Sequence, residues 1–464
     1  MSTALDEIFK AYDVRGTVPD QWDSGAARRI GAAFARFAAA PRVLVARDMR
    51  PSGVALVAAF AEGVMAQGVD VTDLGLASTD LIYFAAGRLD APGAMFTASH
   101  NPARYNGIKF CLSGARPVGE DSGLAEVKAL AGQDLAPDGR TGHRDELDLL
   151  EDYAAHVRSF VDRDALLPLK VVADTANGMG GLVVPKVFEG LPFSLEMLYG
   201  ELDGTFPNHP ADPIQPENLR DLQARVLAAG ADVGLAFDGD ADRVFLVDDR
   251  GQAVSGSTTT AMVATAMLAR HPNSVILHNI ICSKAVPEII REHGGTPVAT
   301  RVGHSFIKAV MASTGAVFGG EHSAHYYFRD NYRADSGAIA ALIVLEMLSR
   351  AGRPLSVFRT AFERYCDSGE INTPVADPQH VLDRVAAHFD PTVYPGVILA
   401  HTDGLTVDLG DWWFNLRPSN TEPLLRLNLE AGDRGSCAAH LAEVLDLISG
   451  AAAPPDPSAT DEER

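Results

Sequence analysis

The sequence predicts an α/β protein of four domains: three similar α/β units with mixed, largely parallel sheets, then a smaller α+β domain, arranged around a central cleft. Three observations predict this fold class. The chain has 464 residues, more than one hydrophobic core usually supports. Strands alternate with helices in a plan that occurs three times, and this plan ends after about residue 360. Such alternation is typical of α/β units with parallel strands.

Each of the three units begins with a β-branched run that ends in a polar turn, at residues 43–53, 171–181 and 274–283. A helical stretch and a second strand follow, and then a further strand runs into a polar, glycine-rich loop. These loops are TASHNP (97–102), FDGDADR (237–243) and FGGEHSAH (318–325). Ligands of α/β sheets bind beyond the carboxyl ends of the strands, so equivalent loops in three units predict one shared site.

The pattern of the last domain is different. The segments ERYCDSGEINTPV, VILAHTDGLTVDL and WWFNLRPSNTEPLLRLNLE read as strands of a smaller sheet, with helices at 377–389 and 436–449. The Pro-rich, charged end of the chain is expected to be disordered. The predicted divisions are 1–147, 148–251, 252–364 and 365–450 for the four domains and 451–464 for the tail.

Charge and composition exclude several classes of function. The net charge is −22 and the pI about 5.0, so neither nucleic acid nor an anionic membrane is an expected partner. The four cysteines lack C-x-x-C spacing, which argues against a zinc site and fits a reducing compartment. The N-terminus has no signal-peptide pattern, and the apolar run Ala338–Leu348 is too short for a membrane span. We therefore expect a cytoplasmic protein, as a monomer or a dimer.

The aspartate loop predicts a metal site. Asp238, Asp240 and Asp242 alternate directly after the apolar strand DVGLAF, so in an extended loop their carboxylates share one side. They repel one another unless a cation joins them, and hard oxygen ligands suit Mg²⁺ or Ca²⁺. An EF-hand is excluded, because Arg243 occupies its glycine position and a strand follows. Three protein oxygens leave positions open, which fits a catalytic Mg²⁺ that also binds a phosphoryl oxygen.

Ser99 lies in the first loop, at the end of a strand, without the G-x-S-x-G pattern of esterases. Its neighbours are rich in hydrogen-bond donors: His100, Asn101, Arg104, Tyr105, Asn106 and Lys109. Alone, such a serine is more often a turn cap. Together with the aspartate loop it is interpreted as a phosphoryl carrier, whose phosphate the metal can bind. Ser99 is thus expected both as the nucleophile and as a metal ligand.

The third loop carries side chains suited to a sugar. Glu321 and Ser323 can hydrogen-bond to vicinal hydroxyls, and His325 can exchange a proton near neutral pH. Zinc binding is the rival interpretation, but the loop lacks a third ligand at a fitting spacing. The segment RVGHSFIK adds His304, which is either structural or a second proton carrier.

A cluster of donors in the last domain predicts a phosphate site. It lies in the strand–turn–strand segment RPSNTEPLLRL and consists of Arg417, Ser419, Asn420, Thr421 and Arg426. Arginine offers a planar fork for phosphate oxygens, and hydroxyls and turn amides supply further donors. In so acidic a protein, this local concentration of hydrogen-bond donors indicates an anion-binding site.

The four loops, in this order and spacing, resemble those of the α-D-phosphohexomutase family, and within it the bacterial phosphomannomutase/phosphoglucomutase group. The resemblance covers the chain up to the tail and implies a phosphoserine loop, a metal loop, a sugar-recognition loop and a phosphate-binding loop. The segment AYDVRG also matches, which adds Tyr12 and Arg15 to the site. The sequence departs from the family pattern at Ala324, usually Gly, and at Pro418, usually Ala.

The resemblance implies a phosphomannomutase that interconverts mannose 6-phosphate and mannose 1-phosphate, and also glucose phosphates. Phospho-Ser99, Mg²⁺ and a hexose 1,6-bisphosphate intermediate are implied with it. Arg15 and Arg243 would orient the phosphoryl group, Lys109 with His304 or His325 would handle the proton, and Tyr12 and His100 would contact substrate. A phosphoglucomutase or phosphoglucosamine mutase is the alternative within the family. A metal-dependent sugar phosphatase or a non-catalytic sugar-phosphate binder is the alternative outside it.

Overall fold

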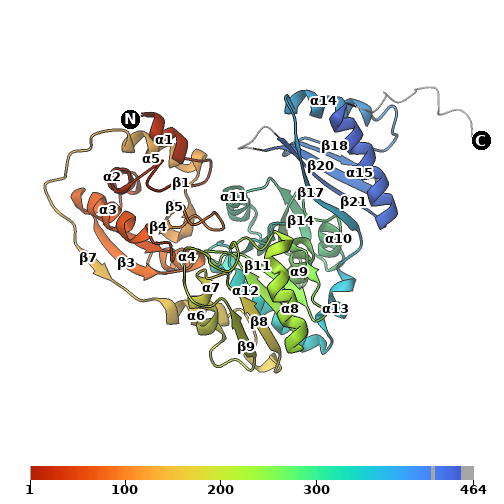
Figure 1. The fold of residues 1–464 in the computed structure, drawn as a ribbon, viewed down its shortest axis with the longest axis horizontal. Coiled ribbons are helices and arrows are strands. Elements are labelled where there is room, and N and C mark those ends of the chain that lie inside the picture. Colours follow the sequence, from red (N-terminus) through yellow and green to blue (C-terminus); the bar gives the residue numbers. More distant parts are fainter. Residues whose placement is uncertain (1, 420–423, 451–464) are drawn as a thin grey trace, which may run out of the picture.

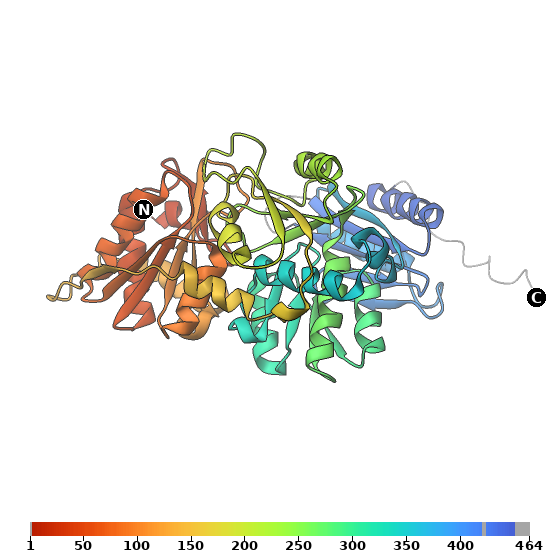
Figure 2. The same ribbon diagram turned by 90° about the horizontal axis from the view of Figure 1, so that it is seen from below.

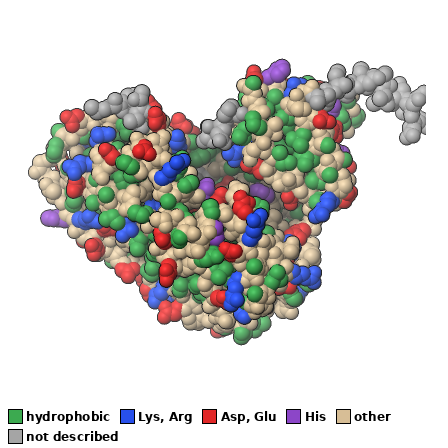
Figure 3. All heavy atoms as spheres, viewed as in Figure 1, with side chains coloured by type: hydrophobic (Ala, Val, Ile, Leu, Met, Phe, Trp, Pro, Cys, Tyr) green, Lys and Arg blue, Asp and Glu red, His purple; other side chains and the backbone are tan. Residues whose placement is uncertain are grey.

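The computed structural model describes residues 2–419 and 424–450, which form four domains that follow one another in space (Figures 1 and 2). In Figure 1 the first domain, in red and orange, lies at the left, and the fourth, in blue, at the upper right. The second and third domains lie below and between them. Figure 3 shows that the surface is hollowed between the first and fourth domains.

The first domain is built on a seven-stranded sheet. Its strands in spatial order are β1 (Val14–Thr17), β5 (Tyr105–Leu112), β4 (Gly93–Phe96), β2 (Arg42–Arg47), β3 (Asp70–Leu76) and β7 (Arg144–Glu146), with β6 (Arg116–Pro117) beside β5. One face packs against α1 (Ser2–Ile8), α2 (Ser24–Ala38), α3 (Gly53–Ala66) and α5 (Leu124–Ala131), and the other against α4 (Thr79–Arg88). Side chains of β2 alternate between these faces, Val43 and Val45 towards the first group and Leu44 and Ala46 towards α4.

The second and third domains follow the same plan. The second has the strands β12 (Ala253–Val254), β11 (Val244–Asp248), β10 (Val233–Phe237), β8 (Lys170–Asp174) and β9 (Ser194–Leu198), with α6 (Leu150–Arg158), α7 (Gly180–Phe188) and α8 (Arg220–Ala229). The third has β14 (Thr296–Thr300), β13 (Val275–Asn279), β15 (Phe318–Gly320) and β16 (Tyr326–Phe328), with α9 (Gly256–Arg270), α10 (Ala285–Glu292), α11 (His304–Thr314), α12 (Gly337–Ala351) and α13 (Leu355–Phe358).

One four-strand unit occurs in all three sheets. Its spatial order is β3-β2-β4-β5 in the first domain, β9-β8-β10-β11 in the second and β14-β13-β15-β16 in the third. Three strands run parallel, and the fourth returns antiparallel beside the third. The connection from the third strand to the fourth carries TASHNP, DGDADR or EHSAH. The prediction of three similar units, each with a motif-bearing loop after the equivalent strand, is therefore confirmed.

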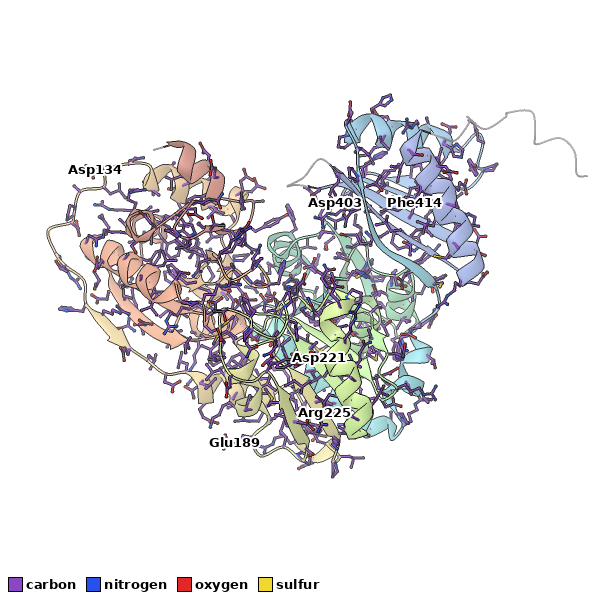
Figure 4. All side chains as sticks on the ribbon, viewed as in Figure 1. Asp134, Glu189, Asp221, Arg225, Asp403 and Phe414 are labelled. Carbon is purple, nitrogen blue, oxygen red and sulfur yellow. The ribbon has the colours of Figure 1, made fainter. Side chains whose placement is uncertain are left out.

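The fourth domain is an antiparallel sheet with its own core. Its strands are β17 (Cys366–Pro374), β21 (Leu424–Ala431), β20 (Trp412–Pro418), β19 (Leu405–Asp408) and β18 (Ile398–Ala400), and α14 (Pro378–His388) and α15 (Arg434–Ser449) pack against them. Figure 4 labels Phe414 in this core and Asp403 at the edge near the third domain. The Asp403 carboxylate accepts a hydrogen bond of 3.1 Å from the Val302 amide, one of the polar links between these two domains.

The first three domains, by contrast, share one continuous apolar core. Its centre includes α12, which confirms that the apolar run at 338–348 is a buried core helix. Among the helices in the described part of the chain, none is both long and apolar enough to cross a membrane. All four cysteines are free thiols, and the predicted disordered tail lies outside the described residues.

Asp80, at the start of α4, joins these three domains through its carboxylate. It accepts hydrogen bonds from Ser78 of the first domain, from Tyr153 on α6, and from Ser336 before α12 at 2.7 Å. The side chain is completely buried, and burial raises its pKa to about 7 although the three hydroxyls act in the opposite direction. One buried carboxyl group thus lies where the first, second and third domains meet.

This contact predicts a pH-dependent stability. Between pH 4 and 7 the unfolded chain ionises Asp80 while the folded protein keeps the proton, so stability falls as pH rises through this window. A shift of about 3 pKa units corresponds to roughly 4 kcal/mol at most. We expect Asp80→Asn, which cannot titrate, to gain in Tm relative to wild type as pH rises from about 5 to 8. The exposed Asp134, labelled in Figure 4, provides the control Asp134→Asn. A constant difference in Tm between Asp80→Asn and wild type would contradict the expectation.

Candidate active site

The loops of the three repeated units meet at one place. The Ser99 Oγ donates a hydrogen bond of 2.8 Å to Asp238 Oδ2, across the first and second domains. The backbones are also in contact, since a Cβ on Gly239 would lie 2.4 Å from the Ser99 carbonyl oxygen. Arg243 and His325 form an antiparallel bridge that joins the second loop to the third. The structure therefore brings the serine, aspartate and recognition loops together.

Ser99 is held in an unusual backbone conformation. Its φ is +48°, in the left-handed region that non-glycine residues seldom adopt, and its amide donates to Thr97 Oγ1 at 2.9 Å. Beside it, His100 Nδ1 accepts a hydrogen bond of 2.8 Å from Arg243 and lies 3.3 Å from Ser99 Oγ. Burial and the positive charge of Arg243 hold the pKa of His100 well below its usual range. His100 is thus a neutral imidazole that helps to place Arg243.

The three loop aspartates fit a divalent cation. Asp238, Asp240 and Asp242 are buried, and each offers an oxygen within 4.8 Å of those of the other two. Asp240 Oδ1 and Asp242 Oδ1 are buried without a hydrogen-bond partner among the described residues. Unpaired carboxylate oxygens in such a place are costly unless a cation binds them. Burial raises the pKa of Asp238 to about 7, against the opposing charge of Arg243.

Lys109, on β5, neutralises part of this charge. Its Nζ lies 2.7 Å from Asp240 Oδ2 and 2.8 Å from Asp242 Oδ2. Burial opposes the charged form of Lys109, but the two carboxylates outweigh it and raise its pKa well above the usual value. Burial likewise raises the pKa of Asp240, but the Lys109 ammonium outweighs it and holds that pKa well below the usual range. Lys109 thus remains an ammonium ion.

Arg15, Arg243 and Tyr12 surround the serine loop. Arg243 Nε donates to Asp238 Oδ2 at 3.0 Å. Arg15 donates to Asp13 and, through Nη1, to the side chain of Asn101 at 2.7 Å. Tyr12 packs edge-on against Phe306 of α11, with ring centroids 6.0 Å apart, so the first domain touches the third here. Arg15 and Arg243 lie far apart in the chain, yet each contacts a residue of the serine loop, Asn101 and His100 respectively.

The recognition loop is held tightly at Glu321 but less so at Ser323. The Glu321 carboxylate is buried and accepts from Tyr327 OH at 2.6 Å, Asn279 Nδ2 at 3.2 Å and the Gly303 amide at 3.3 Å. Ser323 is half-buried, and the side chain of His304 lies outside the described part of the structure. Glu321 can therefore receive a sugar hydroxyl only through its remaining lone pairs.

His325 is paired with a carboxylate that sequence reasoning missed. Its Nδ1 lies 2.7 Å from Asp335 Oδ2, and the other Asp335 oxygen lies 3.2 Å from Lys308 Nζ as an ion pair. Burial alone lowers the pKa of His325, but the carboxylates of Asp242 and Asp335 outweigh it and raise the pKa above the usual value. With Nδ1 engaged by Asp335, the Nε2 atom is left to exchange protons with a ligand.

Two of the predicted phosphate-binding residues, Arg417 and Arg426, face the first domain across a cavity of about 1030 Å³. Tyr12, Arg15 and His100 line it on one side, and Arg417 and Arg426 on the other. The hollow is visible in Figure 3, with Lys, Arg and His side chains inside it.

Arg417 and Arg426 share the carboxylate of Glu370. Its two oxygens lie 3.0 Å from Arg417 Nη2 and 3.2 Å from Arg426 Nη1. Arg426 Nη2 lies 3.5 Å from Ser419 Oγ, whereas Asn420 and Thr421 lie outside the described residues. The Nε atoms of both arginines are buried without a hydrogen-bond partner in the described structure. Because both arginines also line the cavity, their guanidinium groups can meet an incoming phosphate.

This arrangement predicts a binding defect for Arg417→Met. Loss of a charge-assisted hydrogen bond costs about 1.5–3 kcal/mol, which corresponds to a KM raised about 10- to 100-fold, with a much smaller change in kcat. Initial-rate kinetics on a hexose phosphate measure both constants. The exposed Arg434 provides the control Arg434→Met, for which we expect wild-type values. An unchanged KM for Arg417→Met would place the phosphate elsewhere.

Thr79 and Asp335 were not identified from the sequence, and Lys308 was noted in RVGHSFIK without a predicted role. Thr79 Oγ1 donates to Asp240 Oδ2 at 2.6 Å, and Lys308 and Asp335 form the ion pair beside His325. Lys308 lies in the segment RVGHSFIK, but no neighbouring residue of that segment indicates that it pairs with Asp335. Thr79 and Asp335 lie in segments without any motif. Only an alignment of relatives would mark such positions.

Comparisons with known proteins agree with this geometry. Four family models match in order: phosphoglucomutase/phosphomannomutase alpha/beta/alpha domains I (residues 6–133), II (151–251) and III (255–365), and the C-terminal domain (370–447). A protein of Xanthomonas campestris named phosphohexose mutases is 40% identical over 95% of this chain and 99% of its own. The phosphomannomutase of Escherichia coli K12 is 38% identical over 95% and 98%.

The chain belongs to the α-D-phosphohexomutase family. It is therefore an enzyme, a mutase of the isomerase class. A solved phosphoglucomutase/phosphomannomutase family protein of Burkholderia thailandensis superposes with a TM-score of 0.86 at 32% identity, covering 97% of this chain and 99% of its own. A putative phosphomannomutase of Thermus thermophilus shares the fold, with a TM-score of 0.82 at 22% identity over 95% and 99%. The four-domain fold class predicted from the sequence is confirmed by these matches.

Proposed function

We propose that this enzyme is a phosphomannomutase that interconverts mannose 6-phosphate and mannose 1-phosphate, and also uses glucose phosphates. The reaction runs through phospho-Ser99 and a hexose 1,6-bisphosphate. The observation that carries the proposal is the hydrogen bond of 2.8 Å from Ser99 Oγ to Asp238, which sets a potential nucleophile directly on the carboxylate cluster. Relatives at 38% identity that are named phosphomannomutase support the choice of hexose.

The carboxylates of Asp238, Asp240 and Asp242, with the phosphoryl group on Ser99, would hold one Mg²⁺ ion. When bound, the ion neutralises charge on the phosphoryl group. The protein supplies further positive charge from Arg243 and from Lys109, which stays protonated beside Asp240 and Asp242. Positioning and charge stabilisation are the main contributions a protein makes to phosphoryl transfer.

In the first half of the reaction the free hydroxyl of the hexose phosphate attacks the phosphorus of phospho-Ser99. The bond from Ser99 Oγ to phosphorus breaks as the new bond to the sugar oxygen forms, and the Ser99 alkoxide that leaves takes up a proton from water. His325 Nε2 accepts the proton of the attacking hydroxyl, while Asp335 holds Nδ1 and stabilises the imidazolium. A hexose 1,6-bisphosphate results.

In the second half the bisphosphate turns around and presents its other phosphate to Ser99. The Ser99 hydroxyl attacks the phosphorus and releases its proton to water, while the bond from phosphorus to the sugar oxygen breaks and His325 Nε2 protonates the sugar oxygen that leaves. Meanwhile the phosphate that does not react rests on Arg417 and Arg426, across the cavity from the first domain. The recognition loop must accept the sugar in both orientations, so we expect it to discriminate weakly at C2, where mannose and glucose differ.

Initial rates on mannose 1-phosphate, glucose 1-phosphate and glucosamine 1-phosphate test this proposal, each with Mg²⁺ and a hexose 1,6-bisphosphate. We expect turnover of the mannose and glucose substrates and much slower turnover of the glucosamine one. Equal rates on glucosamine 1-phosphate would favour a phosphoglucosamine mutase. A phosphate-release assay runs alongside, and release at the rate of isomerisation would indicate a phosphatase instead.

A further inference from the structure

Arg50 lies behind the loop that carries Ser99. It follows β2, and it is the largest side chain that is completely buried in the described part of the chain. Each of its five N–H donors has an acceptor. These are Asp48 Oδ2 at 3.1 Å from Nε, the carbonyls of Pro102 and Tyr105 at 2.8 and 3.0 Å from Nη1, and those of Ser99 and Asn101 at 2.8 and 2.6 Å from Nη2.

Four of the five acceptors are backbone carbonyls within residues 99–105. A short irregular loop leaves such carbonyls without partners in a helix or sheet, so they need partners elsewhere once they are buried. One guanidinium supplies them all from a single plane. The position of Arg50 therefore fixes the path of the loop from its serine to the start of β5.

Ser99 depends on this support. With φ at +48°, its backbone occupies a region that persists only where the surroundings hold it. Its amide is tied to Thr97 Oγ1, its carbonyl to Arg50 Nη2 and its hydroxyl to Asp238. The Arg50 contact is the one that fixes the carbonyl side of the Ser99 backbone.

The second domain closes over Arg50. A Cβ on Gly204 would lie 2.6 Å from the Arg50 Cα, and the Phe206 ring centroid lies 5.1 Å from the Arg50 Cζ. A cation over an aromatic face is attracted to it, and here the ring also helps to keep water away from the guanidinium. Since Arg50 has no exposed surface, it cannot contact a substrate itself.

We propose that Arg50 is a positioning residue for phosphoryl transfer, which holds the backbone of residues 99–105 so that Ser99 Oγ stays against Asp238. This inference rests on the proposed role of Ser99 as the phosphoryl carrier. A positioning role differs from a purely structural one in what it changes. Arg50 affects the rate at which Ser99 gains and loses the phosphoryl group, and it leaves the affinity of the proposed phosphate site in the fourth domain unchanged.

Arg50→Lys is the decisive variant. It keeps the positive charge, but an ammonium donates from one atom and cannot reach four separate carbonyls. A displacement of about 1 Å at a reacting group can lower a rate about 100-fold, so we expect kcat to fall by about this factor with KM changed less than about threefold. The rate of Ser99 phosphorylation by a hexose 1,6-bisphosphate, followed by intact mass, should fall in parallel.

Hydrogen exchange separates a local effect from general unfolding. In Arg50→Lys we expect faster exchange in the peptide that covers residues 97–106 and unchanged exchange in the rest of the first domain. Arg47→Lys is the matched control, because Arg47 lies three residues earlier and its side chain donates a hydrogen bond of 3.3 Å to the Asp48 carbonyl. It should retain the wild-type kcat and exchange pattern.

Wild-type kcat in Arg50→Lys would overturn the proposal, as would a loss of kcat with faster exchange throughout the first domain. Should Arg50→Lys fail to fold, Phe206→Leu keeps all five hydrogen bonds but removes the ring. For Phe206→Leu we expect a fall in kcat smaller than that expected for Arg50→Lys, with faster hydrogen exchange confined to residues 97–106. An unchanged kcat together with unchanged exchange would overturn the proposal. Activity in a parallel Ser99→Ala would instead refute the proposed function itself.

Discussion

Ser99→Ala is expected to lower kcat by a factor on the order of 10⁴ or more while substrate still binds. The variant removes the oxygen that would carry the phosphoryl group, and no other described hydroxyl donates to Asp238. The arginines proposed to bind the phosphate lie across the cavity from this loop, so the Kd for a hexose phosphate should change little. Steady-state kinetics measure kcat, and binding calorimetry measures the Kd.

Ser113→Ala is the control for this experiment. Ser113 is half-buried in the turn after β5, and its hydroxyl donates to the Asp90 carbonyl at 3.0 Å. It should have the wild-type kcat and KM. A Ser99→Ala enzyme that keeps more than a few per cent of wild-type turnover would rule out the phosphoserine mechanism, whatever the substrate.

Asp240→Asn is expected to abolish most activity through the proposed metal site. Asp240 Oδ2 already accepts from Lys109 and Thr79, and only its buried Oδ1 lacks a partner in the described structure. An amide in this place gives up the negative charge that a cation needs and leaves Lys109 with Asp242 as its one carboxylate partner. We expect the half-saturating Mg²⁺ concentration to rise and kcat to fall by about 10³-fold.

The matched control is Asp248→Asn, also buried and also in the second domain. Asp248 ends β11 and pairs with Arg359 at 2.9 Å, away from the three loops. This variant should lose some thermal stability but keep the wild-type dependence on Mg²⁺. If Asp240→Asn were saturated by Mg²⁺ at the wild-type concentration, the carboxylate cluster would not be the metal site.

The repeated architecture could be predicted because its signals are local. A β-branched run followed by a polar turn marks β2, β8 and β13, and a short apolar strand before each motif marks β4, β10 and β15. The rule that ligands bind beyond the carboxyl ends of strands then predicts that the three loops meet at one site. The structure adds the antiparallel return strand of each unit, which was not distinguished from the parallel ones.

The candidate site could be predicted where a motif concentrates unusual residues, as at Ser99 and Asp238. It could not be predicted where a single common residue acts through a distant partner. Thr79 contacts Asp240 across 161 positions in the chain, and nothing near Thr79 distinguishes it from other helix-starting threonines. Lys109 was expected to take part in proton transfer. Its two buried carboxylate partners favour a permanent positive charge instead.

The most direct test of the account follows the phosphoryl group itself. Enzyme phosphorylated on Ser99 with a labelled phosphoryl group is mixed with unlabelled mannose 1-phosphate and Mg²⁺ and quenched within one turnover. We predict that the label leaves Ser99 at a rate no slower than kcat and appears first in a hexose 1,6-bisphosphate. Label that appears as inorganic phosphate, or that stays on Ser99 while isomerisation proceeds, would contradict the account.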